Sequence, residues 1–263
     1  MINEYEQIEA SAYPMFYVYV ILVSVCFLMT ALLYQKWVER KREANRLLMF
    51  TFLSYSLSFL ILLLGYLQMY FTGEKQEFYQ LSLALSFGGL CISNIILSYF
   101  VAEIFGILRK DLKKNNILGI IITILVLLPW NGYGLPANQI EFPLFRPITN
   151  VCLIIWAMIL YTRISNAAFR IAKKTENPIA QSGFRLIGWA HIMLDLFLFF
   201  MAADTIYFTV FELPGYIFLI YIAYIFCAFF FLTCYLGFIM PEWLKSRIMK
   251  KSSQKSPNNT NNQ

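Results

Sequence analysis

One stretch constrains the fold of this chain more than any other: residues 186–208, with the sequence LIGWAHIMLDLFLFFMAADTIYF. It carries no lysine or arginine and is long enough to cross a bilayer as an α-helix, which takes roughly 20 apolar residues. Yet it holds His191, Asp195 and Asp204. An aspartate at the bilayer centre costs about 2.5–3.5 kcal/mol on insertion scales, so such residues usually face a bundle interior and act there. The stretch therefore predicts a membrane helix whose polar face other helices cover.

Composition extends this prediction to the whole chain. Of its 263 residues, 59% are hydrophobic and only 14% are charged, with a mean hydropathy of +0.61, whereas soluble domains carry about 25% charged residues. We predict an all-α integral membrane protein, a bundle of seven transmembrane helices within residues 13–249, preceded by an extracytoplasmic segment 1–12 and followed by a disordered tail 250–263. The seven apolar runs are residues 13–34, 47–71, 81–108, 117–130, 147–171, 186–208 and 216–240.

The basic residues predict the orientation of these helices. Nineteen of the twenty-one lysines and arginines lie in the segments that close the first, third, fifth and seventh runs, and only Lys75 and Arg146 lie elsewhere. Short cytoplasmic segments of membrane proteins are enriched in lysine and arginine. We therefore expect the N-terminus outside, the C-terminus in the cytoplasm, and the protein in the cell membrane. In this setting the basic surface faces lipid head groups, so we expect no nucleic-acid partner.

Polar residues recur at helical spacing in the second and third runs. The third run carries Asn94 near its middle and Glu103 close to its basic end, where the carboxylate is within reach of Arg109 or Lys110. The second run favours close helix packing, because small and hydroxyl residues let helices approach in lipid, although a role in lining a ligand site stays open. The stripe of the second run is Thr51, Ser54, Ser58, Gly65 and Gln68.

His191 and Asp195 are four residues apart, so they lie on a similar face of their helix. One interpretation is structural: an intrahelical hydrogen bond, with Asn94 or a tyrosine hydroxyl satisfying what remains. The other is a proton switch or an anchor for a small polar ligand, since histidine beside a carboxylate titrates near physiological pH. Both interpretations stay open, and Asp204, Glu103 and Tyr224 of the last run complete the set of candidate residues.

Several classes of activity find no support in the sequence. The chain has one histidine, so a metal site would need His191, Asp195, Asp204 and Glu103 to converge, and we expect neither a metal nor another cofactor. The apolar runs contain no G-x-S-x-G or phosphate-binding glycine loop, and the last run has no lysine to hold retinal. The five cysteines all fall in apolar runs, without a C-x-x-C pair, and are expected to be small core residues.

Two segments between the runs have turn signals. Residues 131–146 (NGYGLPANQIEFPLFR) form the longest loop expected, which is either a connector or a lid over a pocket, and residues 212–215 (ELPG) turn the chain into the last run. The prolines near the runs all lie at expected helix ends, so the helices are expected to be continuous. Continuous helices disfavour a transporter, since transporters often use interrupted helices.

The end of the last run and the start of the sixth resemble a known class. The last run ends in the stretch LGFIMPEWLKSR at 236–247, and the sixth run opens with Arg185 and Gly188 and carries an aspartate. These features are similar to the seven-helix sensor regions that precede histidine kinase or cyclase modules in prokaryotes. Here only a short tail follows, so no kinase activity is implied. The resemblance implies a receptor-like module that acts through a cytoplasmic or membrane signalling partner. A small-solute or ion transporter and an intramembrane lipid-modifying enzyme remain as alternatives.

Overall fold

The computed structural model describes residue 7 and residues 10–106, 109–131, 142, 144–211 and 218–255. Apart from a single β-bridge between Gln7 and Glu74, every regular element in this part of the chain is helical. The α-helices are α1 (Met15–Arg40), α2 (Glu43–Thr72), α3 (Glu77–Phe105), α4 (Leu112–Leu127), α5 (Phe145–Lys174), α6 (Pro178–Phe211), α7 (Phe218–Cys234) and α8 (Glu242–Lys255).

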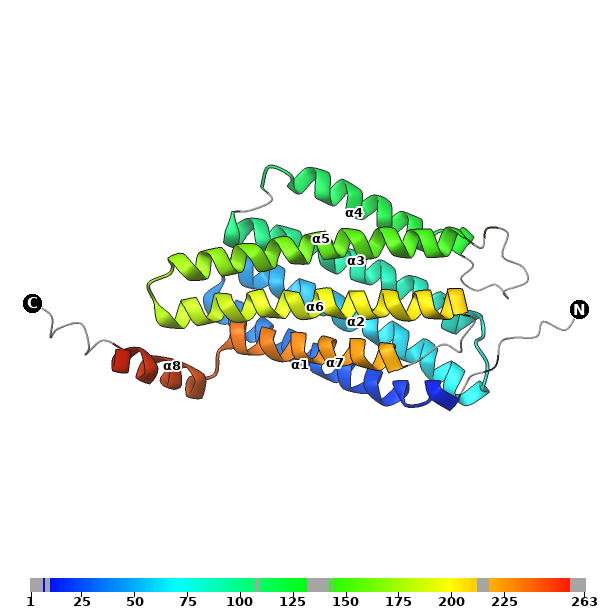
Figure 1. Cartoon of the computed structure of the whole chain (residues 1–263), viewed down its shortest axis with the longest axis horizontal. Helices are drawn as coiled ribbons and strands as arrows, with labels where there is room; N and C mark the ends of the chain where they lie inside the picture. Colours follow the sequence, from blue (N-terminus) through cyan, green and yellow to red (C-terminus); the bar gives the residue numbers. More distant parts are fainter. Residues whose placement is uncertain are drawn as a thin grey trace, which may run out of the picture.

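Helices α1 to α7 run in alternating directions along one another, and α8 extends away from the bundle beyond the end of α7 (Figure 1). Six of them form a closed ring, in which α1 packs on α2, α2 on α3, α3 on α5, α5 on α6, α6 on α7, and α7 back on α1. Helix α4 contacts only the outside of this ring, against α3 and α5. The bundle is therefore a six-helix ring with one peripheral helix.

Six helical segments are long and apolar enough to cross a bilayer: Ala10–Arg40, Glu43–Thr72, Glu77–Phe105, Phe145–Lys174, Pro178–Tyr207 and Phe218–Ile239. The chain is thus a multi-pass α-helical membrane protein. Helix α4, which corresponds to the fourth of the seven expected runs, has only 16 residues, about 24 Å of helix. By length and composition the structure supports six crossings rather than the seven expected.

Most helices extend beyond the apolar runs that predicted them. Helix α4 begins at Leu112 and α6 at Pro178, so basic segments expected to be loops form first turns of helices. Asn177 caps α6, because its Oδ1 accepts hydrogen bonds from the backbone N–H groups of Ile179 and Ala180. Helix α8 continues to Lys255, into the tail expected to be disordered; residues 256–263 lie outside the described part, as do most of segments 131–146 and 212–215.

The seventh helix is continuous from Phe218 to Ile239, but its winding changes after Cys234. A π-helical segment, η4 (Tyr235–Ile239), follows α7, and Met240 after it has a positive φ of 48°. The ammonium of Lys36 on α1 donates hydrogen bonds to the carbonyls of Phe238 and Ile239, at 2.8 and 2.9 Å. These carbonyls close the end of the segment, where a helix leaves its last C=O groups without partners. Lys36 therefore ties the junction between α7 and α8 to α1.

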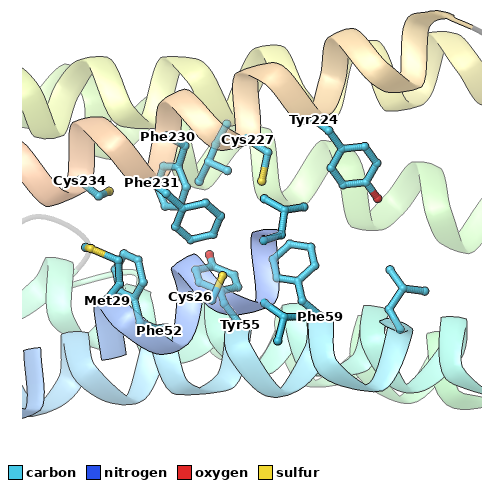
Figure 2. Packing of buried hydrophobic residues seen from close by; sticks show 14 of the residues in the cluster. Cys26, Met29, Phe52, Tyr55, Phe59, Tyr224, Cys227, Phe230, Phe231 and Cys234 are labelled. Carbon is cyan, nitrogen blue, oxygen red and sulfur yellow. The ribbon is translucent and has the colours of Figure 1, made fainter. Parts of the chain in front are cut away.

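The main hydrophobic core draws on all six helices of the ring. Its part between α1, α2 and α7 is rich in aromatic rings and sulfur (Figure 2). Phe52 of α2 contacts Phe230 and Phe231 of α7, with ring centroids 6.2 and 6.1 Å apart. Four of the five cysteines are buried, as expected of small core residues, whereas Cys152 is exposed. A smaller cluster on the other side of the ring joins α4 to its neighbours, and consists of Cys91, Ile122, Val126, Leu153 and Trp156.

The polar stripe of α2 packs against α3, which favours the packing interpretation of that stripe. A Cβ atom at Gly65 would lie 1.9 Å from Ser82 Oγ, and one at Gly89 would lie 2.2 Å from Ser58 Oγ. Ser54 Oγ donates to the carbonyl of Gly89 at 3.0 Å. Small residues thus allow α2 and α3 to approach closely, as in other membrane bundles.

Candidate functional site: a buried polar centre

A cluster of polar side chains lies inside the ring, and we call it the polar centre: Tyr55 of α2, Asn94 of α3, Tyr161 of α5 and His191 of α6. Asn94 is 2% exposed. Its Oδ1 accepts hydrogen bonds from the hydroxyls of Tyr161, at 2.7 Å, and of Tyr55, at 3.1 Å. One amide therefore joins three helices through two tyrosines, and Asn94 faces the bundle interior.

His191 completes the polar centre and is 3% exposed. Its Nδ1 lies 2.8 Å from the carbonyl oxygen of Ile187, one turn earlier in α6. Because a carbonyl only accepts, Nδ1 carries the proton, and Nε2 is then the acceptor of the neutral ring. The ring centroid lies 6.0 Å from that of Tyr161 and 6.2 Å from that of Phe230. His191 therefore stands where α5, α6 and α7 meet.

Asp195 does not share the burial of His191. It is half-buried, and its Oδ2 accepts a hydrogen bond from Thr162 Oγ1 of α5 at 3.0 Å, on an exposed part of the α5–α6 contact. No hydrogen bond joins His191 to Asp195 in the described residues, so the bond that the structural interpretation invoked is not formed in this structure. Four residues turn a helix by about 400°, which leaves the two side chains about 40° apart. Asp195 thus lies at the edge of the interior rather than inside it.

One oxygen of Asp195 is left without a partner. Oδ1 is buried, yet no described residue hydrogen-bonds to it. A buried polar atom without a hydrogen bond costs about 1–3 kcal/mol.

Tyr224 and Asp204 lie apart from the polar centre. The Tyr224 hydroxyl donates to that of Tyr19 at 3.1 Å, and the Tyr19 ring contacts those of Tyr224 and Tyr66 at 5.5 and 5.2 Å. Half-buried Asp204 is close enough to Tyr224 for an electrostatic interaction. His191 thus belongs to the polar centre, whereas Tyr224 belongs to a second cluster with Tyr19 and Tyr66. This second cluster joins α1, α2 and α7 near the start of α1.

Glu103 belongs to neither cluster. Its carboxylate is exposed and lies 4.0 Å from the guanidinium of Arg109, near the end of α3. This is the contact expected of a carboxylate near the basic end of the third run. An exposed ion pair of this kind contributes little to stability.

Sequence reasoning missed Tyr55, Tyr161 and Thr162. Tyr55 lies four residues after Thr51 of the polar stripe in α2, so helical spacing offered a signal for it. Tyr161 and Thr162 offered no such signal. The chain has 17 tyrosines, and the sequence does not show which side chain a given hydroxyl will contact once the chain is folded.

Within the described residues, no group of three or more histidine, cysteine, aspartate or glutamate side chains could hold a metal ion. The polar centre instead links two hydroxyls and an amide by hydrogen bonds, with the His191 ring against Tyr161 and its Nδ1 bonded to its own helix. Comparisons with protein-family models, with curated proteins and with solved structures found no match for this chain.

Proposed function

We propose that the chain is a seven-helix, receptor-like membrane protein, in which the polar centre senses a proton or a small polar ligand. The observation that carries the proposal is His191 at the meeting point of α5, α6 and α7, with Nδ1 bonded to its own helix. Ionisable groups inside membrane bundles are rare and commonly functional. A proton or donor at Nε2 would add charge or a hydrogen bond where three helices touch.

The seventh crossing in this proposal is α4. Its 16 residues give about 24 Å of helix, and η2 (Pro129–Asn131), a 3₁₀ turn at its end, adds about 6 Å. Together they approach the roughly 30 Å of a hydrocarbon core. Exposed isoleucines and leucines on α4 fit contact with lipid: Ile117, Leu118, Ile120, Ile121, Ile124 and Leu127.

The route from the polar centre to the cytoplasm in this proposal follows α7. Phe230 touches His191 and stands one turn before the π-helical segment that leads into α8. π-Helical turns inside or at the end of α-helices often mark functional sites. Helix α8 carries Lys245, Arg247, Lys250, Lys251 and Lys255, so it suits the cytoplasmic surface, where a signalling partner would read its position.

Electron paramagnetic resonance distances test this proposal with protons as the probe. Spin labels at Ser246→Cys of α8 and Glu176→Cys between α5 and α6, both exposed sites, are introduced into a Cys152→Ser background. Because burial disfavours the charged imidazole, we expect the distance distribution in nanodiscs to change as the pH falls from about 8 to about 4. His191→Phe should abolish the change, while Leu194→Ala, at a buried site on the same helix, should retain it. A change that survives His191→Phe, or no change in the parent protein, contradicts the proposal.

A transporter is the second candidate, and the partnerless Oδ1 of Asp195 favours it. Carboxylates in membrane helices mark proton and ion pathways. Proteoliposomes loaded with a pH-sensitive dye separate the two functions when a potassium diffusion potential is applied. A transporter coupled to protons acidifies the lumen and loses this activity in Asp195→Asn, whereas a receptor leaves the dye signal at the level of protein-free vesicles.

A further inference from the structure

A pocket of about 280 Å³ opens at the basic end of the bundle, where α7 gives way to α8. It adjoins the polar centre on α6, because Ile187 lines the pocket and the carbonyl of Ile187 accepts the hydrogen bond from His191. The residues of the polar centre themselves do not line it. Its walls come from the end of α1, the start of α6, the π-helical segment and α8. Three cations line the pocket: Lys36, Arg40 and Lys245. Three apolar side chains of α6 form an apolar wall: Ile179, Phe184 and Ile187.

A close crossing of two backbones shapes the pocket. A Cβ atom at Gly237 of the π-helical segment would lie 3.3 Å from the carbonyl oxygen of Gly183 in α6, and the converse contact has the same length. Both glycines line the pocket. Side chains at either position would push the two elements apart, so the glycines keep the π-helical segment against α6 and fix the pocket beside it.

The charge of the pocket is positive. Two of the three N–H groups of the Lys36 ammonium bond to the carbonyls of Phe238 and Ile239, which leaves one for a ligand. Arg40 and Lys245 line the same space and are close enough to Lys36 for their charges to act on it. Glu242 pairs with Lys245 at 2.5 Å, and Glu39 interacts with Lys36, but neither carboxylate lines the pocket. An anion would meet three cations there.

The apolar wall selects among anions. Ile179, Phe184 and Ile187 of α6 line the same space as the cations, together with Phe238 and Met240. A free inorganic anion would gain nothing from these side chains, whereas the glycerol and first acyl carbons of a lipid would bury against them. Basic pockets between membrane helices on the cytoplasmic side are known sites for anionic head groups.

We propose that this pocket binds the phosphate group of an anionic phospholipid from the leaflet at the basic end of the bundle. The lipid would hold α1, α6 and α8 together at the junction that Lys36 already ties, and so set the position of α8. The proposal concerns the lipid alone and stands whether or not His191 senses protons.

Lipid-dependent thermal unfolding of the full chain tests the proposal. The protein is purified in nanodiscs of phosphatidylcholine alone and of phosphatidylcholine with increasing phosphatidylglycerol. A ligand that binds only the folded state raises the unfolding temperature as its concentration rises. Two double variants carry the same loss of charge: Arg40→Gln with Lys245→Gln inside the pocket, and Arg42→Gln with Arg247→Gln, which are exposed and do not line it.

We expect phosphatidylglycerol to stabilise the parent protein and the control double variant alike, with apparent affinity falling by roughly 30-fold in the pocket double variant. Ala180→Trp, which fills the pocket without changing charge, should also weaken the response. An equal loss in both double variants would show general surface attraction and overturn the proposal. So would stabilisation by inorganic phosphate at the same phosphate concentration, or no stabilisation of the parent protein by phosphatidylglycerol.

Discussion

Asn94 is the residue that holds the polar centre together, because a single amide oxygen accepts both tyrosine hydroxyls. In Asn94→Leu, Tyr55 and Tyr161 lose that acceptor in a dry interior. Hydrogen bonds between membrane helices contribute about 0.6 kcal/mol on average and up to about 1.7. We expect the free energy of unfolding to fall by about 1–2 kcal/mol, measured by denaturation in mixed micelles.

Ser93→Ala is the matched control for this change. Ser93 is buried beside Asn94, but its Oγ bonds only to the carbonyl of Gly89 in its own helix. Its loss should alter stability by less than about 0.5 kcal/mol. If the two variants lose equal stability, the link between helices through Asn94 is not what stabilises the bundle.

Asp195 allows a second prediction, through its bond to Thr162. A double-mutant cycle of Asp195→Leu and Thr162→Val, in which each change removes the hydrogen bond, should give a coupling energy of about 0.6–1.7 kcal/mol in denaturation experiments. The same cycle with Thr123→Val, whose hydroxyl bonds within α4, should give none. Asp195→Leu should insert and fold, because the position is only half-buried. Zero coupling with Thr162 would refute the contact.

The sequence predicted the interior positions of Asn94 and His191 because each is a polar group that lipid would reject in a long apolar run. It placed Asp195 with them because lipid disfavours a carboxylate and because Asp195 is four residues from His191. A rotation of about 40° on α6 was enough to move Asp195 to the α5–α6 edge. Tyr55 and Tyr161 stayed hidden, since tyrosine is common in this chain and suits core, interface and site equally.

At the scale of elements, the packing of α4 against α3 and α5 depends on the absence of a side chain at Gly119. A Cβ atom at Gly119 would lie 2.7 Å from Cζ2 of Trp156 on α5 and 2.9 Å from Cγ1 of Ile95 on α3. Gly119→Leu should therefore push α4 off the ring, at a cost of about 1–3 kcal/mol in unfolding free energy. Ile120→Leu, at an exposed neighbouring site, should change it by less than about 0.5 kcal/mol. Equal effects would mean that α4 does not pack through this glycine.

The apolar runs located the seven helices of the bundle, but they predicted neither where the helices end nor which helix lies outside the ring. Hydropathy marks the part of a helix that suits lipid, so the polar first turns of α4 and α6 were expected to be loops. Hydropathy also did not distinguish α4 from the other helices, although α4 packs on the outside of the ring. The π-helical segment was missed because Pro241 marks where a helix stops and not how its last turn is wound.

At the scale of the whole molecule, the helices are of unequal length. Helices α5 and α6 have 30 and 34 residues, about 45 and 51 Å, which exceeds the roughly 30 Å of a hydrocarbon core. Lys173 and Lys174 lie in the last turn of α5, so the turn between the two helices lies at the basic end. The proposed seven-helix receptor requires that this end faces the cytoplasm and that α4 crosses the membrane.

Cysteine labelling in intact cells tests that requirement most directly. Four exposed positions are replaced one at a time in the Cys152→Ser background: Glu77, Lys110, Leu144 and Ser246. An impermeant maleimide should label Glu77→Cys and Leu144→Cys in intact cells, and Lys110→Cys and Ser246→Cys only after permeabilisation. This pattern requires α4 to cross and the basic end to be cytoplasmic. Labelling of Lys110→Cys and Leu144→Cys from the same side, or the reverse pattern throughout, would contradict the account.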